Sequence, residues 1–309
     1  MRRRSARSCS RTRQPRCASA QAAARPAKPP PTISALRVRL ICYRIPGDDR
    51  RAHRTVRAPA VEGHLVSRDG RRSGARVPPR HRLELGDESL AGYRLIAWDA
   101  PGYGGSAFLS AAEPRPADYA QALHEFLERL LLKDVVLVGN SLGCLMASAY
   151  AAAHPERVRS MLLLGPAGGY GELPETERQA KLAERLRQLD ELGPEGLAAQ
   201  RSPTLVAKGA PPIALELVRW SQRRVRPQGY RQAVYCLAQG RLAVDARRYG
   251  KKVLVACGSE DIITPEAGCK AIARAFPRGE YRTLDSIGHA PHVEAAEQVN
   301  QMIAAFVPR

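Results

Sequence analysis

The sequence predicts an α/β fold in which a mostly parallel sheet carries an inserted group of helices. Three observations support this prediction. From residue 93 onward, short apolar runs alternate with segments whose apolar residues recur at helical spacing. One apolar run enters a Gly-Asn-Ser-Leu-Gly turn, and an alanine-rich helical segment follows. Residues 168–250 contain helical segments broken by Pro and Gly, without an apolar strand among them.

The elements before the Gly-Asn-Ser-Leu-Gly turn are one strand and one helix. Tyr93–Trp98 predicts a buried strand, and a turn-rich loop follows at residues 99–106. Residues 116–132 predict an amphipathic helix because their apolar side chains recur every three or four positions. These side chains are Tyr119, Leu123, Phe126, Leu127 and Leu130.

The turn itself lies between a strand and a helix. The apolar run at residues 135–138 predicts the strand, and residues 145–153 predict the helix. Val158–Leu164 predicts the next strand, which ends at Gly165-Pro166. Strands that alternate with helices pair in parallel, so we expect helices on both faces of this sheet.

We interpret residues 168–250 as a helical cap inserted between two strands of the sheet. Its expected helices lie at residues 174–192, 194–200, 211–225 and 228–239. The alternating pattern then resumes with strands at 252–257 and 280–284 and helices at 265–276 and 293–307. The core of the fold is therefore expected to comprise residues 83–167 and 251–309.

The positive charge of the chain is concentrated in its first 82 residues. Residues 1–82 contain 22 Lys and Arg against 4 Asp and Glu, whereas residues 83–309 contain 27 against 26. A near-neutral globular region thus follows a strongly basic leader. Aromatic residues are almost absent from that leader, and no apolar stretch is long enough to cross a membrane, so we expect neither nucleic acid nor membrane as a partner.

Three accounts of the leader compete. Residues 1–31 are basic and lack acidic residues, which is typical of a cleaved transit peptide. The segment can also be a solvated basic arm for nucleic acid or anionic surfaces, although Tyr43 is its one aromatic residue. The third account is translation of a GC-rich gene in the wrong frame or from a wrong start, and we favour it because the globular region also lacks expected N-terminal strands.

The cysteines indicate a reducing compartment. Seven are present, an odd number, and none forms a close Cys-x-x-Cys pair. Reduced thiols in a cytoplasmic protein are the expected state. No set of His, Asp and Glu has the spacing of metal ligands, so we expect no metal and no cofactor.

The Gly-Asn-Ser-Leu-Gly turn has the features of a nucleophile elbow. A serine on a sharp turn between strand and helix, here Ser141, projects its hydroxyl above the sheet. The flanking glycines let the neighbouring backbone approach closely. The backbone N–H of Leu142 would then point to the place where an oxyanion forms.

A serine hydroxyl needs a base, and the base needs an acid that holds its tautomer. Two carboxylates follow the strand at residues 252–257, namely Glu260 and Asp261, and both are candidates for the acid. His289 follows the last strand, with His292 as the alternative base. The remaining histidines lie in the leader or on helices, where solvation or capping is the simpler interpretation; they are His53, His64, His81, His124 and His154.

With these residues in place, residues 83–309 resemble the α/β-hydrolase-fold serine hydrolases that carry a helical cap. Five stretches carry the resemblance, at residues 99–106, 139–144, 154–158, 258–265 and 288–294. Within that superfamily the chain looks most like enol-lactonases and hydrolases of aromatic meta-cleavage products. The resemblance implies Ser141 as nucleophile, His289 as general base and acid, and Asp261 rather than Glu260 as the orienting carboxylate.

One part of the family pattern is missing. Such folds carry a His-Gly loop after an early strand, and this loop supplies the second oxyanion donor. In the corresponding window, residues 59–82, no apolar strand leads into a His-Gly pair. We therefore expect the N-terminal strands to be missing or replaced, which would leave a sheet edge unpaired.

The resemblance implies hydrolysis of a carboxylic ester or lactone through an acyl-serine intermediate. Two alternatives stay open: a carbon–carbon bond hydrolase of a ring-fission dienoate with the same triad, and an inactive scaffold with an incomplete oxyanion hole. The partner in the first two cases is a small ester, lactone or dienoate. The cap would select it, and Arg219, Trp220 and Tyr230 are our candidates for binding an acidic, partly aromatic substrate. A solvated basic helix face is the competing interpretation of these arginines.

Overall fold

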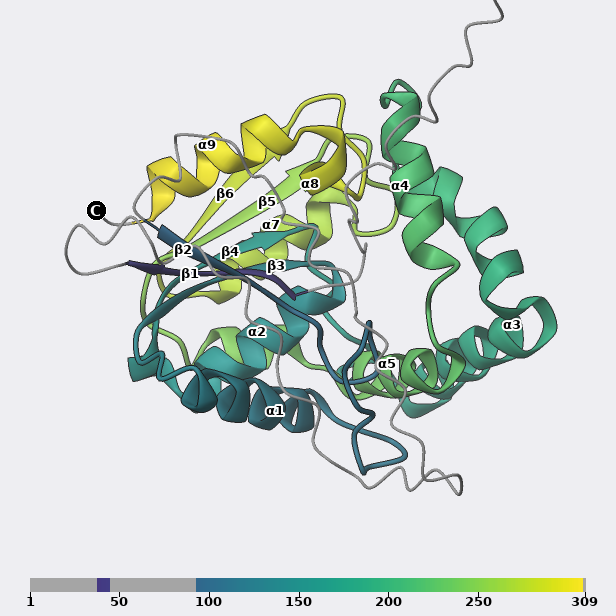
Figure 1. Ribbon diagram of the computed structural model, residues 1–309, viewed down its shortest axis with the longest axis horizontal. Coiled ribbons are helices and arrows are strands. Elements are labelled where there is room, and N and C mark those ends of the chain that lie inside the picture. The colour runs from purple at the N-terminus through teal and green to yellow at the C-terminus, as the bar shows by residue number, and fades with distance from the viewer. Residues whose placement is uncertain (1–37, 45–92, 308–309) are drawn as a thin grey trace, which may run out of the picture. The chain divides into compact units, whose positions relative to one another are not determined.

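The computed structural model describes residues 38–44 and 93–307, all within one compact unit of the chain. The described strands form a six-stranded sheet in the order β2-β1-β3-β4-β5-β6 (Figure 1). They are β1 (Val38–Arg44), β2 (Tyr93–Trp98), β3 (Val135–Asn140), β4 (Val158–Leu164), β5 (Val253–Gly258) and β6 (Gly279–Leu284). Neighbours from β3 to β6 pair in parallel, and β1 runs antiparallel to both β2 and β3. The sheet is therefore mostly parallel, as the sequence predicts.

Strand β1 departs from the prediction that residues 1–82 lie outside the fold. Its backbone pairs with β2 from Val38 opposite Trp98 to Arg44 opposite Tyr93, and with β3 at Ile41 opposite Leu137. The segment contains the apolar cluster of the leader, whose β-branched and aromatic residues favour strands. It therefore lies inside the sheet, between β2 and β3, and β2 is the edge strand on that side among the described strands. The rest of the leader lies outside the described residues.

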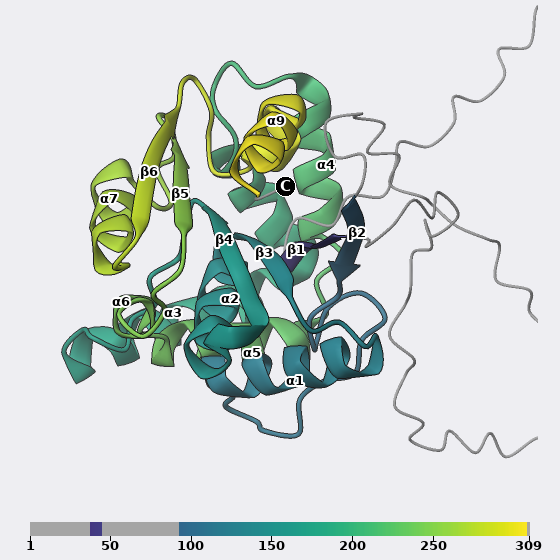
Figure 2. The ribbon, with the colours of Figure 1, turned by 90° about the vertical axis from the view of Figure 1, so that its left-hand side faces the viewer.

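Helices cover both faces of the sheet. On one face lie α1 (Pro116–Arg129), α2 (Leu142–Ala153) and α7 (Glu266–Ala275), and on the other lies α9 (Ala296–Phe306). Figure 2 shows α7 and α9 on opposite sides of β5 and β6. Side chains of β3 alternate between these layers, so Leu137 packs with α2 while Val138 packs with α9.

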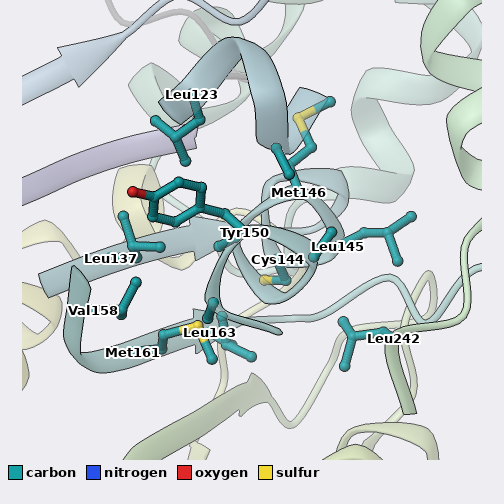
Figure 3. Packing of buried hydrophobic residues seen from close by; sticks show 14 of the residues in the cluster. Leu123, Leu137, Cys144, Leu145, Met146, Tyr150, Val158, Met161, Leu163 and Leu242 are labelled. Atoms are coloured by element: carbon teal, nitrogen blue, oxygen red, sulfur yellow. The ribbon is translucent and has the colours of Figure 1, made fainter. Parts of the chain in front are cut away.

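The larger core cluster surrounds α2. Tyr150, Leu145 and Cys144 of this helix are fully buried, and they pack against strands and helices on all sides (Figure 3). Small residues make α2 apolar all around, which suits a helix enclosed by its neighbours. The turn at the N-terminus of α2 therefore leads into a helix that the larger core cluster encloses.

The helices between β4 and β5 follow the sequence prediction closely. They are α3 (Glu175–Arg201), the short 3-10 turn η3 (Ser202–Leu205), α4 (Pro212–Gln222), α5 (Pro227–Gln239) and α6 (Leu242–Ala246). A break was predicted between residues 192 and 194, and α3 kinks there because Gly193 adopts a φ of 62° before Pro194. Helix α6 was not predicted, since its five residues are too few to display a helical period.

The C-terminal helix is divided in two. The sequence predicts one helix over residues 293–307, but α8 (Pro291–Glu294) and α9 are separated by Ala295 at φ −140° and ψ 53°. Among the described helices, none combines the length and apolarity needed to span a bilayer. Four cysteines, Cys144, Cys236, Cys257 and Cys269, are buried and form no disulfide with one another.

Candidate active site

Ser141 lies on a strained turn between β3 and α2. Its φ of 53° and ψ of −117° are unusual for a residue with a side chain, and such strain is typical of functional turns. The turn is held because the Ser141 N–H donates to the Leu164 carbonyl at 2.9 Å. A Cβ on Gly139 would lie 2.8 Å from the Cys144 nitrogen, so this position requires glycine. The predicted strand, sharp turn and helix are all present.

Leu142 is the first residue of α2. The first N–H groups of a helix have no acceptor within the helix, and the helix dipole makes this end favourable for an anion. The Leu142 side chain is buried and lines the same cavity as Ser141. Its backbone N–H is thus the candidate oxyanion donor that the described residues offer at the turn.

His289 and Asp261 meet beneath this cavity. The distance between His289 Nδ1 and Asp261 Oδ2 is 2.8 Å, and each residue is only 5% exposed. Burial alone raises the pKa of Asp261, but the hydrogen bond and charge of His289, together with donors on Thr264, outweigh it. The resulting pKa of Asp261 lies below its ordinary value of 3.8. The carboxylate is therefore ionised at neutral pH and can accept a hydrogen bond from the Nδ1–H of His289.

Thr264 completes the support of this pair. Its hydroxyl donates to Asp261 Oδ2 at 2.7 Å and lies 3.2 Å from His289 Nδ1. The other carboxylate oxygen, Oδ1, accepts the backbone N–H groups of Ile263 and Thr264, each at 2.9 Å. Asp261 is consequently fixed by its own turn before it contacts the imidazole.

The rival acid and base occupy different surroundings. Glu260 is exposed and accepts the backbone N–H of Lys208 at 3.1 Å, on the outside of the site. His292 lines the cavity from α8, but it is His289 that contacts Asp261. Proximity thus favours Asp261 over Glu260 and His289 over His292.

A cavity of about 230 Å³ lies above these residues. Ser141 and His289 both line it, and the inserted helices form its outer wall. Of the three residues predicted to bind substrate, Tyr230 lines the cavity, whereas Arg219 and Trp220 do not. On α4 the cavity is lined by Val218 and Gln222, which are four residues apart and share one helix face.

The prediction for Arg219 and Trp220 therefore requires correction. Arg219 lies one position along the helix from Val218, faces outward and pairs with Glu216 at 3.1 Å. Trp220 lies under the guanidinium of Arg224, 4.6 Å from its ring centre. Helical spacing groups residues by face, but the chain alone does not reveal which face meets the cavity.

Several residues at the site were not identified from the sequence. Glu294 accepts the backbone N–H groups of Gly288 at 2.9 Å and Ala290 at 3.0 Å, which flank His289. The Asn140 side chain donates to the carbonyl of His289 at 3.2 Å. Both lie within or beside the stretches that carry the family resemblance, so that resemblance was an available signal for them.

Arg185 and Arg201 were also missed. Both line the cavity from α3, where they occur among many surface arginines that share the same pattern. No signal in the sequence distinguishes them. Within residues 93–307, no cluster of three or more His, Cys, Asp or Glu is arranged to hold a metal ion.

Together, the sheet order, the turn at Ser141 and the His289–Asp261 pair define an α/β hydrolase. The chain belongs to the alpha/beta hydrolase fold family, whose sequence model matches residues 81–296. It is therefore an enzyme of the α/β hydrolase class.

Known relatives include several hydrolases. The chain is 27% identical over 238 residues to lipase 1 of Psychrobacter immobilis, covering 70% of this chain and 69% of the lipase. It is 27% identical over 233 residues to the 2-hydroxy-6-oxo-6-phenylhexa-2,4-dienoate hydrolase of Burkholderia cepacia, covering 72% and 80%. The match to the dihydrolipoyllysine-residue acetyltransferase component of the acetoin cleaving system of Pseudomonas putida, 28% identical, covers 69% of this chain but only 56% of the relative.

Among solved structures, the fold is similar to that of the enol-lactonase from Burkholderia xenovorans LB400. The TM-score is 0.62 at 19% sequence identity, and the alignment covers 71% of this chain and 82% of the enol-lactonase. At this identity the likeness establishes the shared fold. It agrees with the α/β-hydrolase fold expected from the sequence.

Proposed function

We propose that the protein is a serine hydrolase that cleaves a small carboxylic ester or lactone through an acyl-serine intermediate. The observation that carries this proposal is the 2.8 Å contact of His289 with Asp261 beside a cavity that Ser141 also lines. We further propose that residues 168–250 form the cap that selects the substrate. Helices α3, α4 and α5 contribute side chains to the cavity wall, which supports this division.

In the acylation step, His289 Nε2 takes the proton of Ser141 as Oγ bonds to the substrate carbonyl carbon. The carbonyl oxygen becomes an oxyanion, which the backbone N–H of Leu142 stabilises. The bond to the alkoxy group then breaks, and His289 returns its proton to the leaving oxygen. Throughout, Asp261 stabilises the imidazolium and keeps the proton on Nδ1.

In the deacylation step, water replaces the alcohol. His289 removes a proton from a water molecule as the water oxygen bonds to the acyl carbon. The ester bond between the acyl carbon and Ser141 Oγ then breaks. Oγ regains the proton from His289, and the carboxylic acid is released. The residues expected to lack the second oxyanion donor, 59–82, lie outside the described part of the chain.

Hydrolysis of a carbon–carbon bond is the second candidate. It is favoured by the relative named as a dienoate hydrolase, with 27% identity and 80% of its length covered. The same serine, histidine and aspartate would serve, with a carbon leaving group protonated in place of an alkoxide. The two candidates therefore differ in substrate and not in the residues used.

Both candidates can be tested with the full-length protein. We expect turnover of 4-nitrophenyl butyrate to exceed that of 2-hydroxy-6-oxo-6-phenylhexa-2,4-dienoate, and both activities to disappear in Ser141→Ala. Ser110→Ala is the matched control, because Ser110 is exposed in the loop before α1. Preferred cleavage of the dienoate would favour the second candidate, and activity that survives in Ser141→Ala would refute the serine mechanism.

A further inference from the structure

Two guanidinium groups line the cavity from the inserted helices. The Arg185 side chain donates to the hydroxyl of Tyr170 from Nε at 3.1 Å and from Nη2 at 2.9 Å. The Arg201 side chain donates from Nη1 to the hydroxyl of Tyr230 at 2.7 Å. All four residues line the cavity, so the two positive charges lie in its wall.

Their partners set these two arginines apart from other arginines on α3, α4 and α5. On the outside of the protein, Arg187 pairs with Glu184 and Glu191, Arg219 pairs with Glu216, and Arg231 pairs with Asp190. Within the described residues, neither Arg185 nor Arg201 forms an ion pair with a carboxylate. A tyrosine hydroxyl orients a guanidinium but carries no charge to neutralise it.

The described part of the cavity wall supplies no carboxylate that could neutralise these charges. Among the described residues that line it, none is Asp or Glu. Burial works against the charge of Arg185, but the hydroxyls of Tyr170 and Tyr230 overcome this and raise its pKa. A guanidinium has five N–H donors, and the tyrosine contacts leave some of them for a ligand. The cavity therefore combines fixed positive charge with partial exclusion of water.

The rest of the wall is largely apolar. Leu205, Val218, Val234, Leu237 and Ile263 contribute to it. An anion with a hydrocarbon body would bury that body against these side chains. A carboxylate matches the planar fork of a guanidinium and forms two parallel hydrogen bonds with it.

We propose that Arg185 and Arg201 form a carboxylate-binding subsite, so that the substrate is an ester or lactone bearing a free carboxylate. The assignment rests on the proposed hydrolase function, because it presumes that the reacting carbonyl lies between this subsite and Ser141. Arg219 on α4 was proposed from the sequence as a residue that binds an acidic substrate. The carboxylate-binding subsite assigns that binding to Arg185 and Arg201 on α3 instead.

The test compares two esters with the same leaving group. One is 4-nitrophenyl butyrate, which is neutral, and the other is mono-4-nitrophenyl glutarate, which carries a free carboxylate. We expect the full-length protein to prefer the glutarate ester in kcat/KM. The ratio of the two kcat/KM values should fall tenfold or more in Arg185→Gln and in Arg201→Gln, because each loses a charge-assisted hydrogen bond.

Arg219→Gln is the matched control, since it removes the same charge from the outer face of α4. The ratio of the kcat/KM values for the two esters should be the same in Arg219→Gln as in the wild-type protein. Thermal melts of each variant establish folding, and Arg185→Lys and Arg201→Lys replace any glutamine variant that does not fold. The lysine variants should lose part of the preference, because they keep the charge but not the planar fork.

The outcomes separate the subsite from the hydrolase function. An unchanged ratio in both arginine variants, with esters still hydrolysed, overturns the subsite alone. If neither ester is hydrolysed, the proposed function fails, and the subsite is judged by calorimetric titration with glutarate against neutral 1,5-pentanediol. Selective glutarate binding that weakens tenfold or more in the arginine variants supports the subsite, and equal or absent binding overturns it.

Discussion

Gly165 lies directly against the carboxylate of Asp261. A Cβ added to Gly165 would come within 2.9 Å of Asp261 Oδ2. It would also lie 3.2 Å from His289 Nδ1, and the φ of Gly165 is +48°, in the left-handed region. Gly165, which follows β4, therefore has two roles. It adopts the left-handed backbone of the turn, and its missing side chain leaves room for the contact between Asp261 and His289.

Replacing Gly165 with alanine should cause a large loss of kcat/KM and only a moderate loss of folding stability. The left-handed backbone alone costs about 1–2 kcal/mol. Displacement of the His289–Asp261 pair by about 1 Å can cost on the order of a hundredfold in kcat/KM. Gly268→Ala is the control, because nothing lies within 4 Å of its Cβ and it lies on α7. Equal ester hydrolysis by the two variants would contradict this account of Gly165.

Asp261→Asn should lower kcat by roughly 10⁴-fold, with little effect on KM. The asparagine oxygen can still accept the N–H groups of Ile263 and Thr264, so the turn survives. Its amide nitrogen would face His289 Nδ1 as a donor and force the proton onto Nε2. Steady-state kinetics on 4-nitrophenyl butyrate provide the measurement, with Glu260→Gln as control. Loss of activity in the control, but not in Asp261→Asn, would reverse the assignment.

Glu294→Ala should reduce kcat by up to about a hundredfold, because the loop on both sides of His289 loses its acceptor. The same carboxylate also accepts the N–H of Ala207 at 2.8 Å, so the inserted helices lose an attachment too. Glu297→Ala, an exposed neighbour on α9, is expected to behave as wild type. We would abandon the positioning role if kcat and its pH profile were the same in both variants.

Acidification below about pH 6.5 should destabilise the fold through His154. Burial and the nearby His124 lower the pKa of His154, although Glu156 acts in the opposite direction. The unfolded chain therefore binds a proton more readily, and the contribution to stability is complete above the ordinary value of 6.5 and lost as pH falls. Asp261, whose pKa is lowered from 3.8, contributes only at more acidic pH.

Thermal melts between pH 8 and pH 5 measure this effect. His154→Gln should flatten the fall in Tm over that range, since the substituted side chain does not titrate. The stacked rings of His124 and His154, 4.3 Å apart, also lose their contact, so the comparison is of slopes rather than of absolute Tm. An identical slope in wild type and His154→Gln would show that His154 is not responsible.

Local patterns predicted most of the sheet and the inserted helices. The bounds of β4 agree with the apolar run Val158–Leu164, and the break in α3 follows from Gly193 and Pro194. These features depend on propensities that neighbouring residues determine. Local patterns did not predict that β1 pairs with β2 and β3, because these partner strands lie far from β1 in the sequence.

At the candidate site, too, local sequence predicted some residues, whereas others depend on contacts between distant parts of the chain. Asp261 and His289 follow strands, the family resemblance selected Asp261 over Glu260, and the structure brings Asp261 and His289 together. The cavity wall depends on which faces of α3 and α4 turn inward. Arg185 and Arg219 are indistinguishable by local pattern, yet only Arg185 lines the cavity.

The most direct test of the serine mechanism is covalent labelling with a fluorophosphonate, followed by mass spectrometry of the digested protein. We expect one adduct per chain, located on Ser141, with labelling abolished in Ser141→Ala and strongly slowed in His289→Gln. His292→Gln should still be labelled. A folded wild-type protein that stays unlabelled, or that is labelled at a residue other than Ser141, would contradict the account.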